Sequence, residues 1–246
     1  WERTGRVMSS RGRMMGRAGV LWLVVAAGCA PAAAAGTARV PETVPVHATP
    51  MQTGGECEIG PRTLVDVRSA DPTIRTDVRY ATRNNFTGAV LPGYERPLAL
   101  LRPPAAEALA RVQARLRARG LGLKVFDAYR PVRATLGMVE WAERTNQLWV
   151  IEQGYVARQS GHNVGRTLDL TLVHLRDGRE LDMGTAYDTF SEAAHTANAS
   201  GRVAENRRVL VEAMAAEGFQ NYDKEWWHFS IPGPREPLDV PLRCFG

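Results

Sequence analysis

The sequence predicts a single α+β domain over residues 57–246, built on a central, mainly antiparallel sheet flanked by helices. Helical and strand patterns are interspersed along this part of the chain, so both kinds of element contribute to the core. The later strand patterns follow hairpin-like turns and irregular loops rather than regular βαβ spacing, which favours antiparallel pairing. The 246 residues and the hydrophobic content of 44% suit one domain with a sizeable core, together with appendages outside it.

Period-two alternation and apolar runs predict the strands. Residues 63–68 and 74–80 alternate between apolar and polar side chains. Residues 121–129 form a more continuously apolar run, residues 168–172 alternate again, and residues 227–231 form the closing strand. These segments would make up the sheet.

Helical spacing predicts three helices. The first opens at Pro103, because proline is favoured in the first turn, and it ends at Gly120. Its apolar residues recur three and four positions apart, as on the buried face of a helix. Residues 132–147 have a looser apolar face, and residues 204–217 form a clear helix that Gly218 stops. We expect these helices to cover the sheet.

Residues 1–35 are predicted to be a secretory signal peptide, with an over-extended reading frame before Met14. The apolar run at residues 20–27 is followed by small residues that suit cleavage, and it is too short to span a bilayer comfortably. Cys29 lies in a sequence similar to a lipoprotein signal box, so a lipid anchor is an alternative to simple cleavage. Residues 36–56 have the composition of a flexible linker. The expected location is the periplasm or the exterior.

The net charge of +5 gives little support to nucleic-acid binding. Five arginines against one glutamate in residues 1–36 account for +4 of this excess, which leaves +1 for the rest of the chain. A nucleic-acid-binding protein would need a basic surface on its folded domain. We therefore expect no nucleic-acid partner.

The chain has three cysteines, and none has the close spacing of a zinc–thiolate site. An exported chain enters a compartment that permits disulfides. Cys57 and Cys244 then stand at the two ends of the folded domain, and the ends of a domain often lie close together. We expect a disulfide between them; the alternative is two unrelated thiols.

A histidine and an aspartate seven positions apart form the first candidate site. In the strand 168–172, leucines alternate with Asp169, so Asp169 points away from the leucine face. A carboxylate on an otherwise apolar strand is costly to bury unless it is paired or bound to a metal. Gly165 lets the backbone bend so that His162 can face Asp169. Alone, such a pair is more often an ordinary surface pair.

A second stretch supplies His228 with Glu225 three residues before it. Together with His162 and Asp169, His228 would complete the three protein ligands of a catalytic zinc. Glu225 would then act as the general base and acid, provided that a turn or bulge brings it beside His228. Arg130, at the end of a predicted strand, could donate to an oxyanion or a carboxylate, or form a structural ion pair.

These stretches resemble the zinc D,D-peptidases with a hedgehog-like fold, and among them the VanX-type D-alanyl-D-alanine dipeptidases. The resemblance covers residues 63 to 232 and depends on motifs that follow one another in the expected order, at 77–82, 85–88, 126–131, 160–169, 183–188 and 221–228. It implies one zinc ion per chain, held by the three ligands above.

The resemblance also implies the roles of the remaining residues. Glu225 would be the general base and acid, and Arg130 would stabilise the tetrahedral oxyanion. Ser160, Tyr80 and Asp188 would line the dipeptide site, with Asp188 suited to the free ammonium of the substrate. The implied reaction is hydrolysis of D-Ala-D-Ala to two D-alanines. The alternatives are a D,D-carboxypeptidase that trims peptidoglycan stems and a non-catalytic module that keeps zinc for structure.

Overall fold

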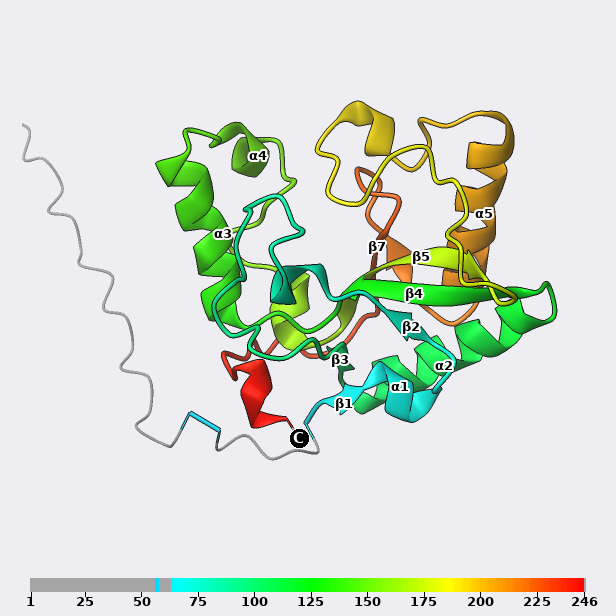
Figure 1. The fold of residues 1–246 in the computed structure, drawn as a ribbon, viewed down its shortest axis with the longest axis horizontal. Coiled ribbons are helices and arrows are strands. Elements are labelled where there is room, and N and C mark those ends of the chain that lie inside the picture. The colour runs from blue at the N-terminus through cyan, green and yellow to red at the C-terminus, as the bar shows by residue number, and fades with distance from the viewer. Residues whose placement is uncertain (1–55, 58–62, 246) are drawn as a thin grey trace, which may run out of the picture. The chain divides into compact units, whose positions relative to one another are not determined.

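The computed structural model describes residues 56–57 and 63–245, and its centre is a five-stranded sheet (Figure 1). The strands run in the order β2 (Arg75–Thr76), β4 (Leu121–Asp127), β5 (Thr167–His174), β7 (His228–Ser230) and β6 (Gln220–Asn221). Only β2 and β4 pair in parallel; the other three pairs are antiparallel. A separate antiparallel pair joins β1 (Val65–Asp66) to β3 (Leu100–Leu101). The predicted α+β class and the mainly antiparallel sheet are confirmed.

Two of the longer helices pack together against the sheet. The α-helices of the described residues are α1 (Val67–Ala70), α2 (Pro103–Arg117), α3 (Val132–Arg144), α4 (Trp149–Glu152) and α5 (Gly201–Ala215). α2 contacts α5 and β4, and α5 also contacts β5. In Figure 1, α3 and α4 lie on the left of the view and α5 on the right, where β4 and β5 also run.

Short 3-10 turns carry several residues of interest. They are η1 (Arg79–Ala81), η2 (Gly161–Val164), η3 (Glu192–Ala194) and η4 (Leu242–Cys244). All but the last residue of β5 are buried, including Asp169 and Thr171 on the face opposite the leucines. Both faces of this strand are therefore covered, and any polar group on it needs a partner.

Two of the predicted strands are much shorter than expected. In the segment 63–68, only Val65–Asp66 is a strand, because the Asp66 carboxylate accepts a hydrogen bond from the Arg68 amide (2.8 Å) and begins α1. In the segment 74–80, only Arg75–Thr76 pairs, and the chain then turns into η1. Side-chain capping and tertiary contacts outweigh the alternating pattern in both places.

The two ends of the domain meet, as expected. Cys57 and Cys244 form a disulfide with their Cα atoms 5.4 Å apart, which confirms that pairing. Tyr129, two residues after the end of β4, fixes the carboxyl-terminal segment: its hydroxyl accepts from the Val240 amide (2.8 Å) and donates to the Val240 carbonyl (3.0 Å). Within the described residues, no helix is long and apolar enough to cross a membrane. The expected signal peptide, the Cys29 anchor and nearly all of the linker lie outside the described residues.

Candidate active site

Strand register and one tight turn assemble the predicted metal ligands. Asp169 on β5 lies directly opposite His228 on β7. His162 lies in η2, which precedes β5 and is capped by the side chain of Ser160. Gly165 ends this turn with a φ of 70°, in the left-handed region, and a Cβ there would lie only 2.5 Å from Leu64. The glycine therefore lets the turn pack against the core and bring His162 back over the strand.

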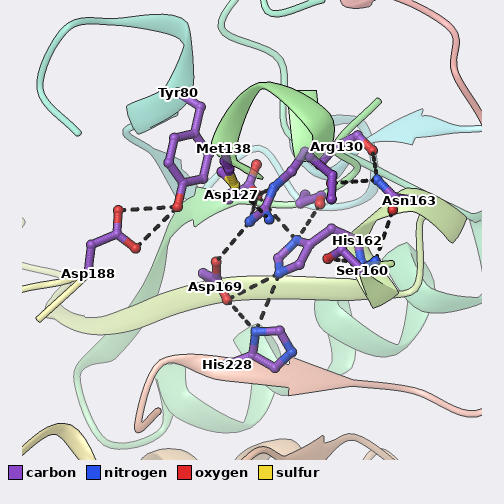
Figure 2. A network of polar contacts seen from close by, with 12 residues as sticks. Tyr80, Asp127, Arg130, Met138, Ser160, His162, Asn163, Asp169, Asp188 and His228 are labelled. Atoms are coloured by element: carbon purple, nitrogen blue, oxygen red, sulfur yellow. Dashed lines mark hydrogen bonds and ion pairs between the residues drawn. The ribbon is translucent and has the colours of Figure 1, made fainter. Parts of the chain in front are cut away.

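The three ligands form a compact triangle (Figure 2). Asp169 Oδ1 lies 3.0 Å from His228 Nδ1 and 3.4 Å from His162 Nε2, and the two ring nitrogens are 3.4 Å apart. Ligand atoms in a tetrahedral zinc site lie about 3.3 Å from one another, given bonds of about 2.0–2.1 Å. The spacing of these atoms therefore fits a zinc ion.

The hydrogen bonds around the ligands also fit a cation. His162 Nδ1 lies 2.7 Å from the Ala128 carbonyl, so we assign its proton to Nδ1, which leaves the Nε2 lone pair free to coordinate. Asp169 Oδ2 accepts from the Tyr187 hydroxyl (2.9 Å), whereas the buried Oδ1 has no hydrogen-bond partner among the described residues. A buried carboxylate oxygen without a partner is costly, and a metal ion would satisfy it.

The ligand carboxylate is held in its charged form. Burial raises the pKa of Asp169, but the neighbouring imidazoles of His162 and His228 outweigh burial and bring the pKa below its usual value. A deprotonated carboxylate is the form that binds a metal.

Glu225 lies beside the ligands because the chain turns between residues 225 and 228. The His228 amide donates to the Glu225 carbonyl (3.2 Å), so the turn expected from the sequence is present. Glu225 Oε2 lies 3.4 Å from His228 Nδ1. Burial, followed by the negative charge of Asp169, raises the pKa of this carboxyl group well above its usual range. A carboxylate with a raised pKa can both accept and return a proton.

Arg130 is held by an ion pair and also faces the site. Its Nε and Nη2 donate to one oxygen of Asp127 (3.0 and 2.8 Å), and Nη2 lies 3.9 Å from Asp169 Oδ2. Its guanidinium lies over the ring of Tyr80, 5.0 Å from the centroid. The two alternatives for Arg130, a structural ion pair and a donor at the site, are therefore compatible. The ion pair with Asp127 fixes the direction in which the guanidinium faces the site.

A cavity of about 220 Å³ brings the eight predicted site residues together. They are Tyr80, Arg130, Ser160, His162, Asp169, Asp188, Glu225 and His228. Asp188 accepts from the Tyr80 hydroxyl at 3.1 and 3.2 Å. Burial, with the charges of Asp169 and Glu225, raises the pKa of Asp188. The cavity lining holds three acidic side chains against one arginine, so it suits positively charged occupants.

Two residues with no predicted role complete the site. Asp127 is fully buried and also accepts from the hydroxyl of Tyr94. Tyr187 stacks on Phe126, with ring centroids 4.7 Å apart, and donates to the ligand Asp169. Both lie inside motifs recognised in the sequence, but only the structure shows which side chains they contact.

Sequence comparison agrees with this geometry. Residues 61–245 match the profile of the Peptidase M15 family, described as D-Ala-D-Ala dipeptidase. A D-alanyl-D-alanine dipeptidase of Enterococcus faecalis is 39% identical over 173 residues, which cover 64% of this chain and 86% of that protein. One of Streptomyces coelicolor is 35% identical over 187 residues, which cover 69% of this chain and 93% of that protein.

A solved structure gives a weaker likeness. The vancomycin resistance D,D-dipeptidase VanXYg, in complex with a D-Ala-D-Ala phosphinate analog, is 20% identical with a TM-score of 0.35. The alignment covers 57% of this chain and 54% of that one, so the assignment depends on the sequence relatives instead. The resemblance inferred from the motifs is confirmed, and the chain belongs to the Peptidase M15 family of D-Ala-D-Ala dipeptidases.

Proposed function

We propose that this protein is a zinc-dependent dipeptidase that hydrolyses D-alanyl-D-alanine to two D-alanines. The observation that carries the proposal is the triangle of His162, Asp169 and His228 at the wall of a small cavity, with an unpartnered buried oxygen of Asp169 facing the two rings. The membership of the M15 family and the names of its relatives support the substrate.

One zinc ion per chain would be held by these three side chains. When bound, zinc supplies Lewis-acid chemistry: it lowers the pKa of water to about 7 and polarises a carbonyl group. Glu225 takes the proton of the attacking water and delivers it to the leaving amine, since its raised pKa suits both directions of transfer. Arg130, already oriented by Asp127, donates hydrogen bonds to the oxyanion that forms on the carbonyl.

The other end of the cavity would bind the substrate's ammonium group. Asp188 accepts from Tyr80, and Arg130, the single arginine or lysine of the described lining, is already paired with Asp127. Ser160 would contact the second residue of the dipeptide. A cavity of about 220 Å³ is smaller than the usual range of ligand pockets, about 300–1,000 Å³, so it suits a small substrate. A longer peptide without a free ammonium at this position would leave Asp188 buried and unpaired, which is costly.

Metal analysis combined with a hydrolysis assay tests the proposal. The purified protein is expected to hold one zinc per chain, to hydrolyse free D-Ala-D-Ala, and to lose activity on chelation and recover it with zinc. A peptidoglycan stem pentapeptide is the competing substrate. Release of D-alanine from the pentapeptide alone would identify a D,D-carboxypeptidase and overturn the proposal.

Replacing the general base separates chemistry from metal binding. Glu225→Ala is expected to lower kcat by about 10²- to 10⁴-fold, because general acid–base catalysis contributes about that much, while zinc stays bound. Glu107→Ala, which removes an exposed carboxylate from α2, is the matched control and should leave kcat unchanged. Full activity of the Glu225 variant would contradict the mechanism. A wild-type protein that binds zinc but is inactive would contradict it as well.

We also propose that the chain is exported and that residues 57–246 form its catalytic domain. The apolar run near the amino terminus and the disulfide between Cys57 and Cys244 support export, because such bonds persist in oxidising compartments. A fusion of residues 1–56 to a reporter enzyme that is active only outside the cytoplasm tests this. Lack of reporter activity with normal expression would refute export, and radiolabelled lipid on Cys29 would distinguish an anchor from simple cleavage.

A further inference from the structure

A second, larger cavity adjoins the metal ligands. Its volume is about 690 Å³, and it shares Ser160, Gly161 and His228 with the cavity described above. It runs between the segment 158–167 and the segment 230–237. We refer to it as the arginine groove. The reaction proposed above does not use it, although it opens directly beside the ligand His228.

The charge of the arginine groove is opposite to that of the first cavity. Its charged lining residues are Arg158, Arg166 and Arg235, and no aspartate or glutamate lines it. The first cavity, in contrast, has three acidic side chains and one arginine. The two regions meet at Ser160, Gly161 and the ligand His228, so a molecule that passes this point meets negative charge on one side and positive charge on the other.

Two of these arginines are free to bind an anion. Among the described residues, neither Arg166 nor Arg235 forms an ion pair, whereas Arg158 lies 3.4 Å from Glu143. The Arg166 guanidinium lies against Gly233 and donates to the Pro232 carbonyl (3.3 Å). Gly233 has a φ of 157°, and a side chain there would collide with the guanidinium. The loop therefore accommodates Arg166 in the groove while leaving its charge without a carboxylate.

The direction of the substrate connects the groove to catalysis. In Figure 2, Asp188 and Ser160 lie on opposite sides of the three ligands. If the ammonium of the first residue lies at Asp188, as in the function proposed above, the second residue extends past the metal toward Ser160. Ser160 is also part of the groove lining, so a second residue at Ser160 lies where the groove begins and its side chain can extend toward the arginines.

We propose that the arginine groove binds a negatively charged side chain on the second residue of the substrate. The substrate class is then dipeptides with D-alanine first and an acidic D-residue second, in addition to D-Ala-D-Ala. This inference rests on the proposed function and on the substrate direction that it assigns. Arg166 and Arg235 are specificity-determining residues for this class.

An isosteric pair of substrates tests the charge alone. D-Ala-D-Glu and D-Ala-D-Gln have nearly the same size, so the ratio of their kcat/KM values reports on the added charge. The zinc-loaded wild-type protein is expected to favour the glutamate dipeptide by roughly two- to fivefold for each arginine, the range of partly exposed ion pairs, and less so at high salt. The ratio should fall toward 1 in Arg166→Ala and Arg235→Ala and below 1 in Arg235→Glu.

Arg119→Ala is the matched control, because Arg119 is an exposed arginine next to the start of β4, at the end of the strand away from Asp127. Its ratio should equal that of the wild type. The inference would be overturned by a wild-type ratio of 1 or less, or by a ratio that stays at the wild-type value in both Arg166→Ala and Arg235→Ala. In either case, hydrolysis of D-Ala-D-Ala would still support the proposed function. Failure to hydrolyse any of the three dipeptides would refute both.

Discussion

The partners of each buried carboxylate at the site separate structural from chemical roles. Asp127 accepts from Arg130 and Tyr94 and lies close to His162, so its hydrogen-bonding capacity is used within the fold. Asp169 accepts a hydrogen bond from the Tyr187 hydroxyl with Oδ2, whereas its Oδ1 has no hydrogen-bond partner among the described residues. Glu225 has only His228 within ion-pair distance among the described residues. The incompletely satisfied carboxylates are the ones available for a metal and a proton.

Removing the hydroxyl that holds Asp169 should weaken metal binding. Tyr187→Phe keeps the stacking on Phe126 but leaves Asp169 Oδ2 without its donor. Loss of such an outer partner typically costs about 10- to 100-fold in metal affinity, and we expect that range for zinc, measured by competition with a chelator.

The control is Tyr129→Phe, since that hydroxyl binds the backbone of Val240 instead of a ligand. It should reduce stability without changing zinc affinity. Equal zinc affinities in wild type and Tyr187→Phe would show that the hydrogen bond to Asp169 does not position the ligand.

The raised pKa of Glu225 gives the reaction a defined dependence on pH. A general base must be deprotonated, so kcat/KM should fall as the pH drops through the pKa of Glu225. Burial is the larger cause that raises this pKa above the usual 4.5, and it persists when a cation on the ligands offsets the charge of Asp169. We expect the acid limb to lie above pH 4.5, measured over a range in which the zinc content stays constant. A limb at or below pH 4.5 with full zinc content would contradict this assignment.

At the scale of elements, the sequence predicts the long periodic segments well and the short ones poorly. The helix from Pro103, the apolar strand after Gly120 and the strand that carries Asp169 follow their patterns. The segments 63–68 and 74–80 have strand patterns, but capping by Asp66 and the turn at η1 leave only two paired residues in each. Short segments depend on local side-chain bonds that a pattern does not contain.

The same distinction applies to the site. The ligands and Glu225 could be named from the sequence because their residue types and spacing are distinctive. The contacts of Asp127 with Tyr94 and of Tyr187 with the ligand Asp169 could not, because they join residues that are 33 and 18 positions apart in the chain. Those contacts depend on the register of β4, β5 and β7, which the residue pattern alone does not define.

The turn that joins Glu225 to His228 depends on one asparagine. Asn221 Nδ2 donates to the carbonyls of Glu225 and His228 (3.0 Å each), and its Oδ1 accepts from Thr196. Asn221→Ala is expected to reduce the free energy of unfolding by about 1–3 kcal/mol, because it leaves part-buried polar groups without their partner. It should also lower kcat, because Glu225 is no longer held beside His228.

Urea denaturation and steady-state kinetics measure the two effects. Asn198→Ala is the matched control: Asn198 also donates to a backbone carbonyl, that of Glu192, but in an exposed turn. Its stability should stay within about 0.5 kcal/mol of the wild type. If Asn221→Ala behaved like this control, the turn would have to be held by its backbone bonds alone.

At the scale of the whole molecule, the disulfide joins the two ends of the catalytic domain. Cys57 and Cys244 are 187 positions apart, so the bond closes nearly the whole domain into one loop. Glu56 adds ion pairs with Arg133 and Arg243, but these side chains are partly exposed, and such pairs contribute little. The covalent link is therefore the main restraint on the amino-terminal end of the described domain, while the metal ligands belong to β5, β7 and η2 in its interior.

Reduction of this bond should lower stability and leave the chemistry intact. We expect dithiothreitol to reduce the free energy of unfolding by about 2–4 kcal/mol, because the open chain gains conformational entropy when it unfolds. Urea titrations of the wild type with and without reductant measure this difference.

The double variant Cys57→Ser/Cys244→Ser should match the reduced protein and be insensitive to reductant. At low denaturant, its zinc content and kcat should equal those of the oxidised wild type, because none of the metal ligands lies near the bond. An unchanged urea midpoint after complete reduction would show that the ends are held by packing, with Tyr129 and Val240 as the contacts to test next.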